Sequence, residues 1–224
     1  MSFLINPFIY SVGCSGSIIS TTNLTAYYKF DSNANDSSGS GLNGTAIGSP
    51  TYTTGKFGDA IDFNGSSQYV SVPDSTLLEG SGGSISVFCW VNMDGFGDGA
   101  PHAVAKWGTT TGWRLVPRSG DILITLAGTN IGRGTGVPTG SWVHIGFTYN
   151  NSILKVYQNG SQVGTDASVG ALTLANVRDM HIGKRNNAPA DYLDGRVDEV
   201  NVWQRVLTPT EISTIYNSTC PINT

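Results

Sequence analysis

Charged residues are scarce in this sequence, and basic residues never form a cluster. The 224 residues include 12 Lys and Arg and 16 Asp and Glu, which gives a net charge of −4. A protein that neutralises the phosphates of a nucleic acid needs a stripe of Lys and Arg, so we expect no nucleic-acid partner. Apolar runs also stay far below the ~18 residues that cross a bilayer, so we expect no insertion into a membrane.

Sequence signals of catalysis are missing as well. No Gly-x-Ser-x-Gly motif is present, and the three histidines lie far apart in the chain. Cysteine is rare, with Cys89 in an apolar strand-like run and Cys14 and Cys220 near the two ends. An odd number without repeated spacing is no disulfide framework. We therefore interpret all three as free thiols, with a pair between Cys14 and Cys220 as the alternative.

Glycine and short β-forming runs are abundant instead. There are 29 glycines, and from Leu24 onward runs rich in Val, Ile, Thr and aromatic residues alternate in period two between turn clusters. The dipeptide Asn159-Gly160 predicts a type I′ hairpin. Near the end, Thr208 and Glu211 flank a proline in a capping-box pattern and predict one short helix. The sequence therefore predicts an all-β fold, a two-sheet antiparallel sandwich with one short C-terminal helix.

Several sequence blocks carry a family resemblance. In order, they read LTAYYKFD, DSSGSGLNG, GKFGDAIDFNGSSQYVSVP, SISVFCWVN, SWVHIGFTYNNSILKVYQNG and LDGRVDEVNVWQRVLTPTEISTIY. This series resembles the laminin-G-like domain of the concanavalin A-like lectin/glucanase superfamily, over roughly residues 24–216. The resemblance implies a jelly-roll sandwich used for glycan or protein binding. We divide the chain into an apolar leader at 1–22, the sandwich at 23–218 and a tail at 219–224.

Enzymes of that superfamily carry paired carboxylates, and only the segment DGRVDEV offers a cluster here. Asp198 and Glu199 are adjacent, so on a regular strand they point to opposite faces. Asp194 and Asp198 share a face but lie about 13 Å apart at ~3.3 Å per residue. A retaining glycosidase needs about 5–5.5 Å between its carboxyl groups. We therefore predict a protein that is not an enzyme.

The polar loop FDSNANDSSGSGLNG is rich in the oxygen ligands that calcium prefers. It does not fit an EF-hand, which needs glycine and glutamate at fixed positions. The family resemblance implies one structural Ca²⁺ held by Asp31, Asp36 and Asp198, with Asn33 and Asn43 as further oxygens. The alternative is that these residues only form turns with their own backbone.

Glycan binding requires an aromatic platform and directional polar groups. Loops of this kind occupy residues 94–102, 106–114, 130–136 and 184–192. The candidate glycan-binding residues are Phe96, Trp113, Arg114, Arg133, Arg185, Asn186, Asp191 and Tyr192. Tryptophan is buried on average, and we interpret Trp107 as part of the core.

The leader contains six large apolar residues within the first ten positions and no charge. Such a patch marks an interaction site, and its members are Phe3, Leu4, Ile5, Phe8, Ile9 and Tyr10. This start resembles leaders of tailed-bacteriophage structural proteins. The resulting hypothesis is a noncatalytic virion decoration, fibre or tail component at the virion surface. Its leader would bind other virion proteins, and its sandwich would bind host-surface glycans, with several copies in one assembly. The alternatives are a secreted or cell-surface bacterial lectin-like module and a structural cement protein that binds no sugar.

Overall fold

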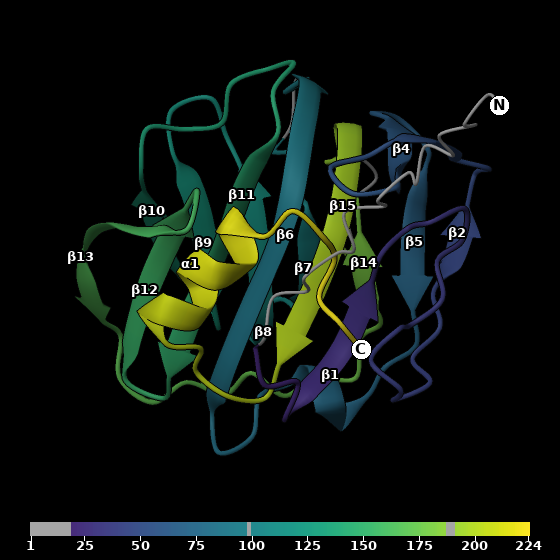
Figure 1. Ribbon diagram of the computed structural model, residues 1–224. Helices are drawn as coiled ribbons and strands as arrows, with labels where there is room; N and C mark the ends of the chain where they lie inside the picture. The colour runs from purple at the N-terminus through teal and green to yellow at the C-terminus, as the bar shows by residue number, and fades with distance from the viewer. Residues whose placement is uncertain (1–18, 98–99, 187–190) are drawn as a thin grey trace, which may run out of the picture.

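The computed structural model describes residues 19–97, 100–186 and 191–224. Two antiparallel sheets pack face to face (Figure 1). In spatial order, the larger sheet contains β13 (Ser161–Ser168), β12 (Ile153–Gln158), β11 (Val143–Asn150), β6 (Ser84–Gly95), β15 (Asp194–Trp203), β4 (Asp59–Asn64) and β3 (Thr51–Thr54), with β1 (Leu24–Tyr28) paired to β15. The other contains β10 (Thr129–Arg133), β9 (Ile122–Leu126), β8 (Gly112–Pro117), β7 (Val104–Trp107), β14 (Met180–Ile182), β5 (Tyr69–Val72) and β2 (Thr45–Ile47). The predicted all-β sandwich is confirmed.

The main core lies between the two sheets, where each strand contributes every second side chain. Val87, Cys89 and Val91 of β6 face Trp113 and Leu115 of β8, and all five are buried in one hydrophobic cluster. Cys89 is a free thiol in this core. Burial raises its pKa above the usual range, so it fills space as a small apolar side chain.

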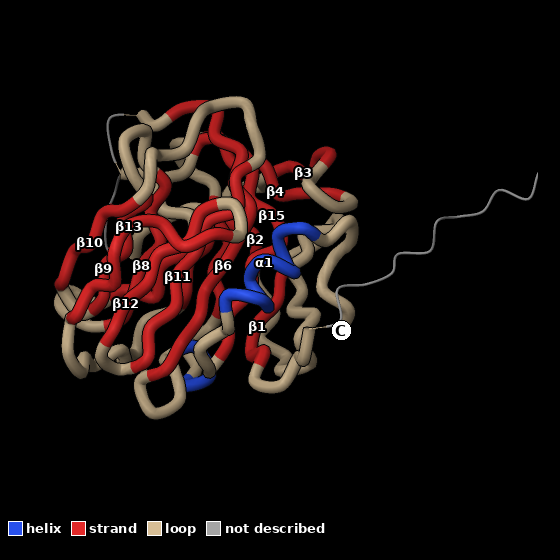
Figure 2. The backbone as a smooth tube through the Cα atoms, turned by 60° about the vertical axis from the view of Figure 1, so that its left-hand side comes forward, coloured by secondary structure: helices blue, strands red, loops and turns tan. Residues whose placement is uncertain are grey.

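Among the described residues there is one α-helix, α1 (Pro209–Asn217), and it lies on the outer face of the larger sheet (Figures 1 and 2). The predicted capping box is present, because the Thr208 side chain accepts from Glu211 N and the Glu211 side chain accepts from Thr208 N. A short 3₁₀ helix (Thr76–Leu78) precedes β6. No helix among the described residues is long and apolar enough to cross a membrane.

A second hydrophobic cluster fills the space between α1 and the sheet. It joins the helix to both flanking segments and comprises Ile19, Leu24, Tyr27, Phe88, Tyr157, Trp203, Leu207, Ile212, Ile215 and Ile222. Ile19 belongs to the predicted leader and Ile222 to the predicted tail, so both segments contribute to packing of the body. The six residues predicted to anchor the chain to a partner lie outside the described residues.

The cysteine prediction needs a correction. Cys220 is buried and disulfide-bonded, so the expectation of three free thiols is wrong at this position. Cys14 lies outside the described residues. Sequence could not decide the matter, because pairing depends on how the C-terminal segment folds back onto the body.

Strand β15 departs from regular alternation at Asp198 and Glu199. Val197 and Val200 both face the main core, so the two residues between them lie together on the opposite face. The register with β6 shifts at this point, and Glu199 adopts a φ of 52°. This is a β-bulge. The prediction that Asp198 and Glu199 point to opposite faces is therefore wrong.

Candidate functional site

The eight predicted glycan-binding residues do not form one site. Trp113 is fully buried, and its Nε1 donates to the Leu78 carbonyl at 2.8 Å. Its ring cannot serve as a sugar platform, because it belongs to the core. Arg133 lies at the edge of the smaller sheet, where it donates to the carbonyls of Gly132 at 2.8 Å and Thr165 at 3.4 Å.

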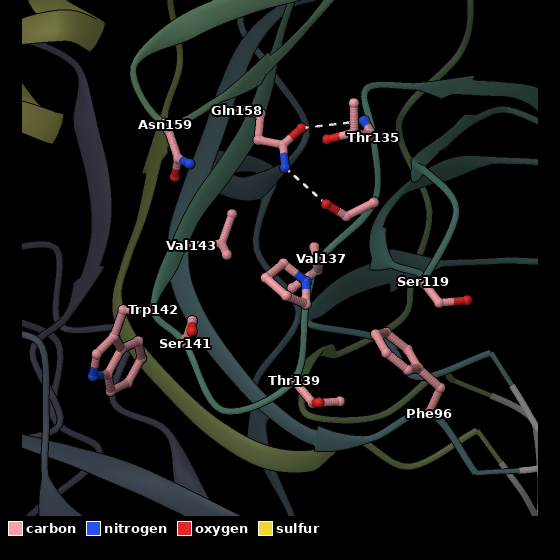
Figure 3. Close-up of a pocket in the computed structure, with 12 residues that line it drawn as sticks. Phe96, Ser119, Thr135, Val137, Thr139, Ser141, Trp142, Val143, Gln158 and Asn159 are labelled. Atoms are coloured by element: carbon pink, nitrogen blue, oxygen red, sulfur yellow. Dashed lines mark hydrogen bonds between the residues drawn. The ribbon is translucent and has the colours of Figure 1, made fainter.

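Phe96 lines an open groove of about 760 Å³ at one rim of the sandwich. Its other aromatic wall is Trp142, a half-exposed residue that directly precedes β11. Figure 3 shows the two rings on either side of Thr139, with Gln158 above them. Trp142 is not among the predicted glycan-binding residues, because it lies in the β-forming run SWVHIGFTYN and not in one of the four candidate loops.

Hydrogen bonds fix the walls of this groove. Gln158 Nε2 donates to the Gly136 carbonyl at 2.8 Å, so the segment after β10 is tied to the end of β12 (Figure 3). Gly140 N donates to the Met93 carbonyl at 2.8 Å, which ties the far end of the same segment to β6. The hydroxyl groups of exposed Ser119 and Thr139 also line the groove. The groove therefore contains two aromatic side chains and several polar groups, and hydrogen bonds to β6 and β12 hold one of its walls in place.

A second, smaller cleft of about 370 Å³ collects three of the predicted residues. Arg114, Arg185 and Asn186 line it together with Trp107. Asn186 is buried, and its amide accepts from Trp107 N at 3.1 Å and donates to the Asp179 carbonyl at 2.7 Å. Both the oxygen and the nitrogen of this amide form hydrogen bonds within the protein, so Asn186 stabilises the wall of the cleft.

The two arginines of this cleft are held differently. Arg185 Nη2 pairs with Asp191 Oδ2 at 2.8 Å. The Arg114 guanidinium lies 4.9 Å from the centre of the Trp107 ring, and its Nε donates to Thr125 Oγ1 at 2.8 Å.

Tyr192 lies beside this cleft in an aromatic cluster on the same sheet. Its ring centre is 6.3 Å from that of Tyr69, which lies 4.9 Å from His181. The Lys184 ammonium is 4.6 Å from the Tyr69 ring centre and 4.7 Å from that of Tyr192. Burial, followed by the charge of Lys184, lowers the pKa of His181 to about 4, so this imidazole is neutral at pH 7.

The predicted calcium loop is held by its own hydrogen bonds. Asp36 Oδ1 accepts from Tyr27 N at 3.0 Å and Ser38 N at 2.9 Å, and its Oδ2 accepts from Leu42 N at 3.1 Å. Asn43 Oδ1 accepts from Asp36 N at 3.0 Å. Asn33 Oδ1 likewise accepts from the backbone two residues on, in an Asx turn. These oxygens already have N–H donors.

Asp31 and Asp198 do approach one another at the turn between β3 and β4. Asp198 Oδ2 accepts from Lys56 N at 2.8 Å and Phe57 N at 3.1 Å, while Asp31 Oδ1 accepts from Asp59 N at 3.0 Å. Within the described ranges, no group of three or more His, Cys, Asp or Glu side chains is placed to hold a metal.

The five predicted ligands thus do not present a shell of free oxygens, and calcium here stays a prediction. Thermal unfolding with and without EDTA tests it. A drop in Tm in EDTA that calcium reverses would support the ion. An unchanged Tm would mean that the loop is a hydrogen-bonded turn.

Asp198 and Glu199 form a buried acidic pair, in which Glu199 lies against the C-terminal segment and Asp198 against the turn between β3 and β4. Glu199 accepts a hydrogen bond from the Tyr27 hydroxyl, which in turn accepts from Ile222 N at 2.9 Å. Burial, followed by the charge of Asp198, raises the pKa of Glu199 to about 8. Burial also raises the pKa of Asp198 to about 7, against three backbone N–H donors that lower it. The enclosed pocket beside Glu199 measures about 10 Å³, which is room for no more than one water molecule.

Comparisons with solved structures show the same fold. Domain 4 of AbnA, a GH43 extracellular arabinanase from Geobacillus stearothermophilus, in complex with arabinotriose, matches with a TM-score of 0.71 and 22% identity over 87% of this chain and 98% of that chain. The binding domain of Paraclostridial Mosquitocidal Protein 1 matches with a TM-score of 0.71 and 19% identity, over 88% of this chain and 52% of that chain. The binding domain of botulinum neurotoxin DC in complex with rat synaptotagmin II matches with a TM-score of 0.67 and 13% identity, over 89% of this chain and 52% of that chain.

Sequence comparisons agree with this fold. Neuronal pentraxin-2 from Cavia porcellus is 32% identical over 98 residues, which are 39% of this chain and 22% of that protein. This chain therefore spans about a fifth of the length of the curated relative it matches. The laminin-G model described as the concanavalin A-like lectin/glucanases superfamily matches residues 64–213. The chain belongs to the concanavalin A-like lectin/glucanase superfamily.

Proposed function

We propose that this chain is a noncatalytic, lectin-like binding domain that holds a glycan in the groove between Phe96 and Trp142. The observation that carries the proposal is the pairing of two aromatic side chains across an open groove of about 760 Å³. A sugar ring packs one apolar face on an aromatic ring and directs its hydroxyls at polar groups. Ser119 and Thr139 supply such groups at the groove wall.

The neighbouring folds support a binding role. The structure of arabinanase domain 4 contains arabinotriose, and the neurotoxin binding domain is bound to a protein receptor. Fold alone does not choose between sugar and protein. The aromatic groove favours sugar, because its polar side chains are hydroxyls and amides and no charged side chain among the described residues lines it.

The noncatalytic part of the proposal rests on the acidic pair. Asp198 and Glu199 are a pair of neighbouring carboxylates on one strand, but both are buried and are engaged by backbone or tyrosine donors. A glycosidic bond could not reach Glu199 without displacing the C-terminal segment, or Asp198 without displacing the turn between β3 and β4. We therefore expect no hydrolysis of any glycan that the protein binds.

A glycan array followed by calorimetry on the best hit tests the groove. Trp142→Ala and Phe96→Ala should each weaken binding at least tenfold, about 1.4 kcal/mol. Val177→Ala is the control, because Val177 is 88% exposed and lies outside the groove lining. Unchanged affinity in both aromatic variants, with unchanged Tm, would remove the groove as the site. Silence across all glycans would instead favour the cement protein.

We also propose the virion as the setting. The support is the uncharged leader with six large apolar residues in its first ten positions, which would need a partner surface to cover them. The test is deletion of residues 1–15, followed by sedimentation with assembled particles. Loss of particle association with retained glycan binding would support the virion setting. Equal behaviour of both forms, without any particle association, would favour the secreted or cell-surface module.

A further inference from the structure

We propose that the cleft between Trp107, Arg114 and Arg185 is a second binding site, which takes the acidic group of a carboxylate- or sulfate-bearing sugar. It lies on the smaller sheet, and it shares no lining residue with the groove of Figure 3. The inference does not depend on glycan binding in that groove.

The first argument is how Arg114 is held. Its Nε donates to Thr125 Oγ1 at 2.8 Å, and Thr125 Oγ1 donates to Asn130 Oδ1 at 2.7 Å. Its Nη1 lies 3.3 Å from His102 Nε2. Burial, followed by the charge of Arg114, lowers the pKa of His102 to about 3, so this imidazole is neutral and accepts the hydrogen bond. Neutral partners thus fix the guanidinium in place, and among the described residues no carboxylate pairs with it directly, although the Asp191 carboxylate acts on its charge from a distance.

The second argument is the balance of charge in the cleft. Arg114 and Arg185 contribute two positive charges, and Asp191 supplies one negative charge through its ion pair with Arg185. Within the described part of the chain, Arg114 forms no ion pair, and neither does the neighbouring Lys184. The cleft is therefore positive on a protein whose net charge is −4.

A half-buried guanidinium without a carboxylate partner is costly, because burial removes part of its hydration. Burial and the neighbouring Arg185 lower the pKa of Arg114 by more than the Asp191 carboxylate raises it, so its surroundings are on balance unfavourable for its charge. An acidic ligand would compensate it. Arginine presents its donors as a planar fork that matches carboxylate and sulfate oxygens.

The shape of the cleft favours a sugar over a bare anion. A volume of about 370 Å³ is within the range of small-molecule sites and far exceeds that of one carboxylate. Arg114 is stacked on Trp107, so its plane is fixed. Thr109 is exposed at the rim of the cleft, where its hydroxyl can bond the other hydroxyl groups of the bound sugar.

Calorimetry with matched probes tests this site. We expect 3′-sialyllactose, or a disaccharide that contains glucuronic acid, to bind at least tenfold more tightly than lactose, and more weakly as salt is raised. Arg114→Gln and Arg185→Gln should each abolish that preference. Arg178→Gln is the matched control, because Arg178 is exposed and outside the cleft lining. Tm measurements show whether each variant is folded.

The outcomes separate the two sites. Loss of acidic-sugar binding in the Arg114 and Arg185 variants, but not in Trp142→Ala, supports a distinct anionic site even if the groove binds nothing. Equal affinity for acidic and neutral sugars would overturn the proposal, as would an equal loss in Arg178→Gln. Sulfate alone binding as tightly as the acidic sugar would reduce the cleft to an anion site. Binding of an acidic peptide with no acidic sugar would assign it to a protein partner.

Discussion

Replacement of Glu199 by glutamine should make the protein less sensitive to alkaline pH. Glu199 is 4% exposed, and one carboxylate oxygen, Oε1, has no hydrogen-bond partner among the described residues. Its other oxygen accepts from the Tyr27 hydroxyl. Glutamine keeps the shape and a carbonyl acceptor for Tyr27, and it removes the charge that would otherwise form inside the protein.

The size of the effect follows from linkage. The pKa of Glu199 is raised from 4.5 to about 8 by burial and by Asp198, and one pH unit corresponds to about 1.4 kcal/mol. Ionising the folded protein therefore costs about 5 kcal/mol more than ionising the unfolded chain. Between these two pKa values the folded state holds a proton that the unfolded state has released. Stability is thus fully present below pH 4.5 and falls as pH rises toward 8.

Urea unfolding at pH 5 and pH 9 measures this loss. We expect Glu199 to account for on the order of 3 to 5 kcal/mol of the stability that the wild-type protein loses between the two pH values, with Asp198 adding to that loss, and Glu199→Gln to lose at least 2 kcal/mol less than the wild type. Asp94→Asn removes one charge from an exposed residue and should follow the wild type. Equal pH dependence of Glu199→Gln and the wild type would show that Glu199 is already ionised in the folded protein, and would refute the reasoning.

Three further predictions concern stability, each measured by urea unfolding against the wild type. Lys106→Met should lower the free energy of unfolding by about 3 kcal/mol, because the buried ammonium pairs with Asp74 at 2.6 Å and Glu79 at 3.2 Å. Unchanged stability would mean that both carboxylates regain full hydration. Thr208→Ala should cost about 1 kcal/mol by loss of the helix cap, with no loss expected if the first turn of α1 is frayed. Gly58→Ala should cost more than about 1 kcal/mol, since φ is +57° and a Cβ would collide with Asp31 Oδ1; wild-type stability would show that the turn can shift.

Local sequence signals were sufficient for the hairpin at residues 159–160 and for the C-terminal helix. Asn159 has a φ of 50° and Gly160 a φ of 76°, as the predicted type I′ hairpin between β12 and β13 requires. The capping box at Thr208 is present as expected. These features depend on a few neighbouring residues, so the sequence contains the physical information that determines them.

The candidate sites were harder, because their residues meet through packing between distant loops. Arg114, Arg185 and Asn186 are predicted glycan-binding residues, and they do share a cleft. Trp113 is also a predicted glycan-binding residue, yet Trp113 and Arg114 are neighbours on β8 and must point to opposite faces. Alternation alone could have excluded one of them, and the apolar series that continues through Leu115 identifies Trp113 as the inward residue.

The spacing of the valines in the sequence also predicts the bulge in β15, although an assumption of strict alternation hides it. Inward residues of a regular strand recur at every second position, but the valines of VDEVNV stand at positions 197, 200 and 202. The spacing of three before the spacing of two is a shift of phase by one residue, and it falls at Asp198 and Glu199. Such a shift requires one extra residue in the strand. The same extra residue brings two carboxyl groups to the outer face of the larger sheet. Glu199, and not a glycine, has the positive φ of this bulge, which strains the backbone. The hydrogen bond from the Tyr27 hydroxyl and the burial of the C-terminal segment against it offset that strain.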